Sequence, residues 1–199
     1  MPIDRLKPPK LLPERPFFSS GPCVKYPSFD VTALEKALLG RSHRCALGQK
    51  RIMQVIRQTQ KILALPAHYH LAIIPGSDTG AMEAALWSLL GCRGVDILAF
   101  EAFGQLWAHD VADQLGVRDI RVVASAYGEL PEYRQLDFNR DVVFVYNGTT
   151  SGVCLPALDF IPQQREGLSF CDASSAAFIL NLDWKRLDVV TFSWQKALG

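Results

Sequence analysis

The sequence lacks the features that mark several large classes of protein. It has no long apolar run near its start, because residues 1–18, MPIDRLKPPKLLPERPFF, contain five prolines and several charges. Such a segment resembles neither a signal peptide nor a membrane span. The formal net charge is only +1, and the basic residues are scattered along the chain. These absences argue against membrane insertion and nucleic-acid binding, and they favour a cytoplasmic location.

Cysteine and histidine are also too sparse to suggest a metal centre. The five cysteines lie far apart and form no Cys-x-x-Cys pair. His68 and His70 flank Tyr69, but no third ligand at metal-binding spacing accompanies them. We therefore expect reduced cysteines, most of them small core residues, and no metal site.

The sequence does have enough apolar content for one globular domain, since 49% of its 199 residues are hydrophobic. Residues 1–28 are rich in proline and glycine and are expected to form an extended N-terminal arm. Residues 29–199 are expected to form the domain itself. The boundary follows the point at which helical periodicity begins.

The domain alternates helical segments with short apolar runs, which is typical of a parallel sheet with helices on both faces. Glycine follows two of the predicted helices as a left-handed C-cap, at positions 91 and 116. The predicted helices are 30–40, 46–65, 79–90 and 102–115, and the predicted strands are 71–74, 97–100, 120–124, 142–146, 169–171 and 189–192. The fold class is therefore α/β.

Ligands of an open parallel sheet bind beyond the carboxyl ends of its strands. The turn from Gly76 to Gly80 leads from a predicted strand into a helix, where backbone N–H groups can hold a phosphate. Asp172 and Lys196 follow two other strands. A buried Asp172 needs a cationic or hydrogen-bonding partner, and a deprotonated lysine amine forms Schiff bases with carbonyls.

Each of these features also has a purely structural interpretation. The turn can be an ordinary connection capped near Asp78, and Asp172 can cap the Ser174–Ser175 turn. Lys196 can be a solvated loop residue. Phe103 can be a core aromatic rather than a platform for a ligand ring. Residue by residue, these alternatives stay open.

Six sequence blocks together resemble one family. They are FSSGP at 18–22, SHR at 42–44, PGSDTGA at 75–81, NGTTSG at 147–152, CDASS at 171–175 and TFSWQK at 191–196. In this order they are similar to the N-terminal part of the phosphoserine aminotransferases, which are fold-type-I, class V enzymes that use pyridoxal 5'-phosphate. The resemblance covers nearly the whole chain.

The resemblance implies a role for each matching residue. Lys196 would hold the cofactor as a Schiff base and move the proton, and Asp172 would keep the ring nitrogen protonated. Phe103 would stack on the ring, and Thr149 would bond near its phenolic oxygen. The cofactor phosphate would be held by Ser77, Asp78, Thr79 and Gln195.

The resemblance also implies substrates and a partner. Glutamate would donate its amino group to 3-phosphohydroxypyruvate, giving phosphoserine and 2-oxoglutarate. His43 and Arg44 would bind substrate anions across a homodimer interface. Family members continue past Lys196 into the rest of the large domain and a smaller C-terminal domain, so we expect the large domain here to be incomplete and the small domain to be absent.

Three alternatives remain at the level of sequence. One branch of the family has an arginine near the phosphate turn, where this chain has Ser77, Asp78 and Thr79, so recognition of the substrate phosphate is left open. The chain can also be another class V enzyme, such as an alanine–glyoxylate aminotransferase or a cysteine desulfurase. Finally, it can be a non-catalytic remnant that binds cofactor or a partner.

Overall fold

The computed structural model of the chain describes residues 25 and 27–198. Its centre is a five-stranded parallel sheet with the strand order β2-β1-β3-β4-β5. The strands are β1 (Val95–Ala99), β2 (Ile120–Ala124), β3 (Asp141–Val145), β4 (Ser169–Asp172) and β5 (Val189–Thr191). Each matches a predicted strand with its ends shifted by two residues at most. The predicted parallel α/β fold is confirmed, while the predicted N-terminal arm lies almost wholly outside the described residues.

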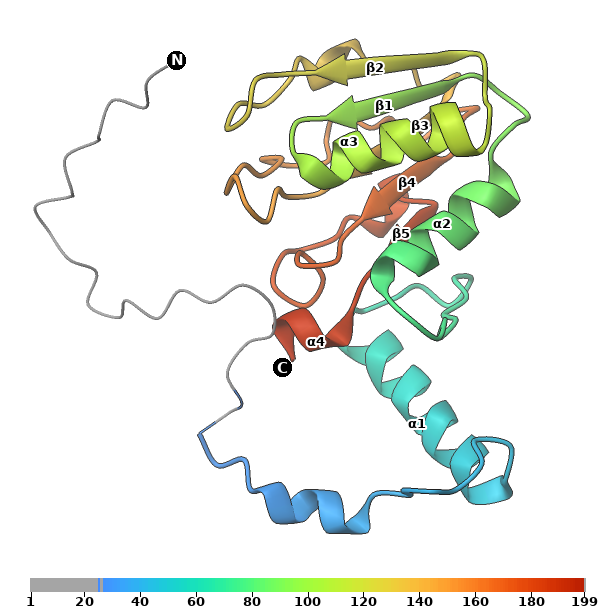
Figure 1. Ribbon diagram of the computed structural model, residues 1–199, viewed down its shortest axis with the longest axis vertical. Coiled ribbons are helices and arrows are strands. Elements are labelled where there is room, and N and C mark those ends of the chain that lie inside the picture. The colour runs from blue at the N-terminus through green and yellow to red at the C-terminus, as the bar shows by residue number, and fades with distance from the viewer. Residues whose placement is uncertain (1–24, 26, 199) are drawn as a thin grey trace, which may run out of the picture.

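The central strands β1 and β3 are buried along their whole length, and their side chains alternate between two cores. On one face, Ile97 and Val143 pack with Met82 of α2 (Asp78–Leu89) and Trp107 of α3 (Ala102–His109). Both helices lie on this face of the sheet (Figure 1).

The opposite face of the sheet has a different cover. There, Leu98 and Phe144 pack with Leu155, Ile161 and Leu187. These covering residues come from irregular connections, and the helices among them are the short 3-10 turns η3 (Tyr133–Gln135) and η4 (Trp184–Arg186). Both faces are covered, but only one by α-helices of the described residues.

One predicted strand is wrong. Residues 71–74 form no backbone pairing, and Ile73 and Ile74 are 39% and 46% exposed. They lie across a cavity of about 530 Å³ from residues 189–194, which include β5. A strand requires a neighbour that accepts its backbone hydrogen bonds, and no described segment pairs with these residues. Apolar character in the sequence does not show whether such a neighbour exists.

The helices also differ in detail from their predicted forms. Residues 30–40 contain the 3-10 helix η1 (Val31–Lys36) rather than an α-helix, and Val31 is 68% exposed, so this segment does not bury an apolar face. The next helix, α1 (Ala46–Ile62), ends three residues early. Helix α3 passes at His109 into the π-helix η2 (Asp110–Gln114). Gly91 and Gly116 both have positive φ, as predicted.

Helix α1 is attached to the sheet domain through its C-terminal end. The Trp194 indole nitrogen donates to Thr59 Oγ1 at 3.0 Å, and the Trp184 indole nitrogen donates to the Leu63 carbonyl at 2.8 Å. Trp194 opens α4 (Trp194–Ala197), which lies near α1 in Figure 1. The remainder of α1 leaves Leu47, Met53 and Val55 exposed.

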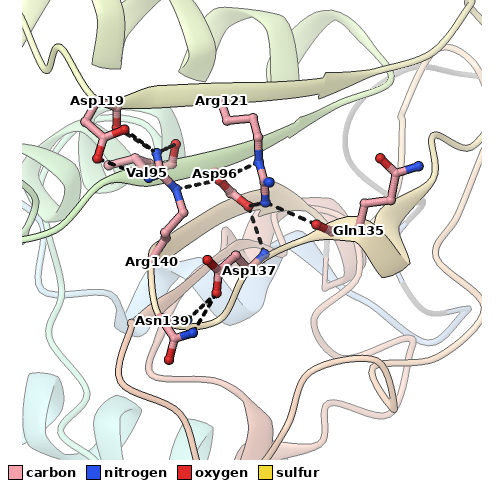
Figure 2. Close-up of polar contacts among 8 residues, drawn as sticks. All are labelled: Val95, Asp96, Asp119, Arg121, Gln135, Asp137, Asn139 and Arg140. Atoms are coloured by element: carbon pink, nitrogen blue, oxygen red, sulfur yellow. Dashed lines mark hydrogen bonds and ion pairs between the residues drawn. The ribbon is translucent and has the colours of Figure 1, made fainter.

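A network of charges closes the amino-terminal edge of the sheet (Figure 2). Asp96 of β1 is fully buried and accepts hydrogen bonds from Arg121 and from Arg140 Nε, the latter at 2.7 Å. Its Oδ2 also accepts the backbone N–H of Asp137 at 2.9 Å. Arg140 in turn bonds both carboxylate oxygens of Asp119. Every buried charge in this network has a partner.

Candidate active site

A cavity of about 320 Å³ lies at the carboxyl edge of the sheet. Because all five strands are parallel, the loops that follow them meet there. All eight residues predicted to contact a cofactor line this cavity, namely Ser77, Asp78, Thr79, Phe103, Thr149, Asp172, Gln195 and Lys196. His43 and Arg44 do not; they are exposed in the turn before α1.

The turn before α2 leads into a capped helix N-terminus at the cavity. Gly76 has a φ of +117°, a conformation that side chains other than glycine rarely adopt. Ser77 is the N-cap of α2, and its Oγ accepts the N–H of Gly80 at 3.2 Å. The cap is thus Ser77 rather than Asp78. The remaining free N–H groups of the first turn lie at the positive end of the helix dipole.

Asp172 is a buried carboxylate, only 3% exposed, at the end of β4. Its Oδ1 accepts the backbone N–H of Ser174 at 3.0 Å, so the turn-capping interpretation is correct. Its Oδ2 accepts the indole N–H of Trp107 at 3.1 Å. Two donors therefore fix the orientation of this carboxylate, and Oδ2 keeps further lone-pair capacity for a partner in the cavity.

The Asp78 side chain points away from the phosphate turn. Its Oδ2 accepts hydrogen bonds from Ser174 Oγ and, at 3.4 Å, from Thr191 Oγ1. Its Oδ1 is buried and has no partner among the described residues. Burial, together with the negative charge of Asp172, raises the pKa of Asp78 to about 6. Of Asp78, only the backbone N–H remains suited to a phosphate.

A third carboxyl group, Glu101, lies near this edge of the sheet but does not line the cavity. It is 1% exposed, and its Oε1 accepts the N–H of Gly104 at 2.6 Å as the N-cap of α3. Its Oε2 is buried without a partner among the described residues. Burial is the main cause that raises the pKa of Glu101, and the charge of Asp172 adds to it. Glu101 comes two residues after the end of β1, so it belongs to the same sheet edge.

Phe103 of α3 and Lys196 of α4 both line the cavity. Phe103, in the first turn of α3, is 39% exposed, which contradicts the alternative that it is a core aromatic. Lys196 lies in α4 and forms no hydrogen bond or ion pair with any residue that the structure describes. It is also the one cation among the described residues that line the cavity.

The polar loop after β3 completes the rim. The side-chain amide of Asn147 donates to Ser175 Oγ at 3.0 Å, and Thr149 Oγ1 lies 3.5 Å from the same oxygen. A side chain at Gly148 would collide with Ser151 Oγ at 2.3 Å and with Glu101 Cγ at 2.9 Å. Glycine at this position is therefore what allows the loop to approach Glu101.

Sequence reasoning missed three residues that shape the site, namely Glu101, Trp107 and Thr191. The buried position of Glu101 directly after a strand was a visible signal, comparable to that of Asp172. Trp107 lies 65 residues from Asp172, and no local pattern links the two. Thr191 ends β5 and contacts Asp78 across 113 residues.

The three carboxyl groups explain what the cavity can bind. None of Asp78, Glu101 and Asp172 forms an ion pair with an arginine or lysine of the described part of the chain. Uncompensated buried acids favour a cationic partner. A protonated pyridine ring meets this need at Asp172, and its phosphate suits the α2 N-terminus. The donor and acceptor set therefore fits pyridoxal phosphate.

Comparison with known proteins supports the same conclusion. The chain is 51% identical over 191 residues to the phosphoserine aminotransferase of Methanosarcina barkeri, covering 96% of this chain and 52% of that protein. This chain is a relative of the phosphoserine aminotransferases. It spans about half the length of the curated phosphoserine aminotransferases that it matches. No family model matches the chain.

Solved structures show the same architecture. The phosphoserine aminotransferase of Trichomonas vaginalis, solved with its pyridoxal phosphate, matches with a TM-score of 0.71 at 18% identity, covering 92% of this chain and 54% of that one. Pyridoxamine–pyruvate aminotransferase of Mesorhizobium loti matches with a TM-score of 0.72 at 18% identity, covering 89% and 47%. These likenesses confirm the predicted fold-type-I aminotransferase architecture.

The described residues contain no helix that is long and apolar enough to cross a membrane. Within the same residues, no group of three or more His, Cys, Asp or Glu side chains is arranged to hold a metal ion.

Proposed function

We propose that this chain forms the cofactor-binding part of a phosphoserine aminotransferase. The observation that carries the proposal is that Lys196, Asp172, Phe103 and the turn before α2 line one cavity. When bound, pyridoxal phosphate supplies an electron sink for the carbanion formed at the substrate Cα. The chain's own residues must place the ring, hold the phosphate and move one proton.

Each residue has a task that follows from its position. Asp172, held by two N–H donors, would bind the ring nitrogen. Phe103 would cover one face of the ring. The first turn of α2, together with Gln195 and Thr149, would hold the polar groups of the cofactor. Lys196, which has no partner among the described residues, would accept and return the Cα proton.

The substrates proposed are those of the relatives' named activity. Glutamate would give its amino group to 3-phosphohydroxypyruvate, producing O-phosphoserine and 2-oxoglutarate in the cytoplasm. Both substrates are multiply anionic, whereas the cavity lining within the described residues contains only one cation. Further cations must therefore come from elsewhere.

A second copy of the chain is the source that we propose. His43 and Arg44 do not reach the cavity of their own chain, and a guanidinium suits carboxylate or phosphate. The same region exposes apolar side chains, among them Leu39, Leu47, Met53 and Val55. Exposed apolar surface next to an arginine and a histidine that do not reach their own cavity supports a homodimer with shared active sites.

The first test is whether the chain captures the cofactor at the proposed lysine. The purified chain is incubated with pyridoxal phosphate, reduced with borohydride and digested. We expect mass spectrometry to find a pyridoxyl group on Lys196 and to lose it in Lys196→Ala. Lys185→Ala, which changes an exposed lysine of η4 outside the cavity, is the matched control. Label spread over many lysines in place of Lys196 would count against the proposal.

The second test concerns the acceptor. Loaded protein is given glutamate with 3-phosphohydroxypyruvate, glyoxylate or pyruvate in separate reactions, and 2-oxoglutarate is measured. Production that depends on 3-phosphohydroxypyruvate supports the proposed substrate. Production with another acceptor alone would replace it with a different class V activity.

A further inference from the structure

The carboxyl groups of Asp78 and Asp172 form a pair, although the two residues are 94 positions apart in the chain. A phosphate-binding role for the Asp78 side chain would not explain this pair. Ser174 joins the two side chains: its backbone N–H donates to Asp172 Oδ1 at 3.0 Å and its hydroxyl donates to Asp78 Oδ2, and both carboxyl groups line the cavity. A carboxylate cannot donate a hydrogen bond, so a bond between two carboxyl groups requires one proton in the pair. The question is which oxygen carries it and what that proton does.

The surrounding donors place this proton on Asp78. Both oxygens of Asp172 already accept N–H bonds, from Trp107 Nε1 at 3.1 Å and from the Ser174 backbone at 3.0 Å. Asp78 has weaker support, because its Oδ2 accepts hydroxyl bonds from Ser174 and Thr191 and its buried Oδ1 has no partner among the described residues. This distribution of donors favours the ionised form of Asp172 and the protonated form of Asp78. Burial, the largest cause of its raised pKa, agrees with this assignment.

We propose that Asp78 is a positioning residue for the ring-nitrogen partner: protonated, it donates to Asp172 before the cofactor binds, and it releases that proton when a pyridinium docks on Asp172. This proposal rests on the proposed cofactor site and assigns the Asp78 side chain to the ring-nitrogen end rather than to the phosphate. The O–H bond of Asp78 breaks, its electron pair stays on the carboxylate, and the proton passes to the solvent.

The release follows from charge balance. A pyridinium on Asp172 adds one positive charge to a pocket of uncompensated acids, which favours the ionised form of Asp78. Other titratable groups around the pair contribute to the balance but lie on other elements. Cys171 is beside it on β4 with a raised pKa, Glu101 is behind Asp172, Lys196 borders the cavity, and His70 and Asp188 line the neighbouring cavity with Asp78.

The pair can be tested without cofactor. Carboxyl-carbon NMR of the aspartate-labelled chain gives the titration midpoint of Asp78, with its signal assigned by its loss in Asp78→Asn. We expect a midpoint well above that of an ordinary aspartate, and a lower one in Asp172→Asn. An ordinary midpoint, or one unmoved by Asp172→Asn, would overturn the pair. Ser174→Ala, which removes a donor to Asp78, should move the midpoint upward in a folded chain.

Proton release is tested by cofactor affinity. Titration of the chain with pyridoxal phosphate at pH 5 and pH 7 should show binding about tenfold weaker at pH 5, as expected for one proton lost from a group titrating near pH 6. Asp78→Asn should flatten this ratio, while the background from the phosphate and Lys196 remains. An equal ratio of the affinities at pH 5 and pH 7 in the wild-type chain and in Asp78→Asn would overturn proton release. Absence of binding at both pH values would overturn the proposed cofactor site and proton release together. The NMR titration midpoint of Asp78 would still show whether Asp78 and Asp172 interact.

Discussion

The two edges of the sheet hold buried carboxylates in opposite electrostatic settings. At the amino-terminal edge, Asp96 is paired with Arg121 and Arg140 and also accepts a backbone N–H (Figure 2). At the carboxyl edge, Asp172 and Asp78 have N–H and hydroxyl donors but no arginine or lysine ion pair within the described residues. The first arrangement is complete within the protein. The second requires a cation to complete it.

This difference shows that one edge of the sheet contributes to the stability of the fold and that the other is suited to binding a ligand. A buried charge that is fully paired stabilises only the fold, because nothing remains for a ligand to satisfy. A buried acid with raised pKa and an unpartnered oxygen keeps free energy available for binding. Four variants test whether the two edges differ in this way.

The largest effect is expected for Asp96→Asn. It leaves Arg121 and Arg140 without their shared negative partner, so the free energy of unfolding should fall by about 3–5 kcal/mol in urea denaturation. Asp119→Asn is the control, because Asp119 is 73% exposed in its side chain and bonds the same Arg140. It should change the free energy of unfolding much less, because solvent screens an exposed ion pair. Equal losses in the two variants would remove the distinction between buried and exposed pairing at this edge.

Trp107→Phe should destabilise the chain by about 1–3 kcal/mol, because Asp172 loses the donor to its Oδ2. Trp107 is fully buried, so a similar aromatic limits the loss of packing. Trp87→Phe on α2, where the tryptophan is 60% exposed, is the control and should change stability little. Cofactor affinity should fall in the first variant only. A purely structural role for Trp107 would lower stability and leave affinity unchanged.

The pH dependence of the free energy of unfolding should show that the acids at the carboxyl edge of the sheet lack a cationic partner. The pKa of Asp78 is raised from 3.8 to about 6, so the folded chain holds this proton more tightly than the unfolded chain. Its stabilising contribution is present below pH 3.8 and is lost as the pH rises through 6. Urea denaturation from pH 4 to pH 7 should therefore show that wild-type loses stability relative to Asp78→Asn. A relative gain would mean the opposite sign of the pKa shift.

Phe103→Leu should have the smallest effect and should act on binding alone. Removing one stacking face costs about 0.5–1.5 kcal/mol, so the dissociation constant for pyridoxal phosphate should rise by a few-fold to about tenfold. The melting temperature without cofactor should barely change, because Phe103 is 39% exposed. A large fall in melting temperature would show that the ring supports the fold rather than the ligand.

Much of this arrangement can be predicted from sequence, for a physical reason. Residues 142–146 are a short apolar run flanked by turns, and burial on two faces makes such a strand visible in the sequence. Once the sheet is parallel, the loops after its strands must meet at one edge, so Asp172 and Lys196 come together without further information.

The features that could not be predicted depend on contacts between residues far apart in the sequence, which a local pattern does not contain. Residues 71–74 are as apolar as the true strands, but pairing is a property of the neighbour. The orientation of the Asp78 side chain depends on Ser174, which lies 96 residues away and cannot be linked to Asp78 by a local pattern. The N-terminal arm, the homodimer and the substrates stay predictions.

The indole of Trp107 has one more consequence. The indole is buried and bonded to Asp172. Asp172 is also the residue proposed to bind the ring nitrogen of the cofactor. An aromatic chromophore docked there would absorb in the range where a tryptophan emits, and energy would pass between them over this short separation. The protein therefore contains its own optical reporter, and quenching of Trp107 emission should follow occupancy of the site in real time, without any label.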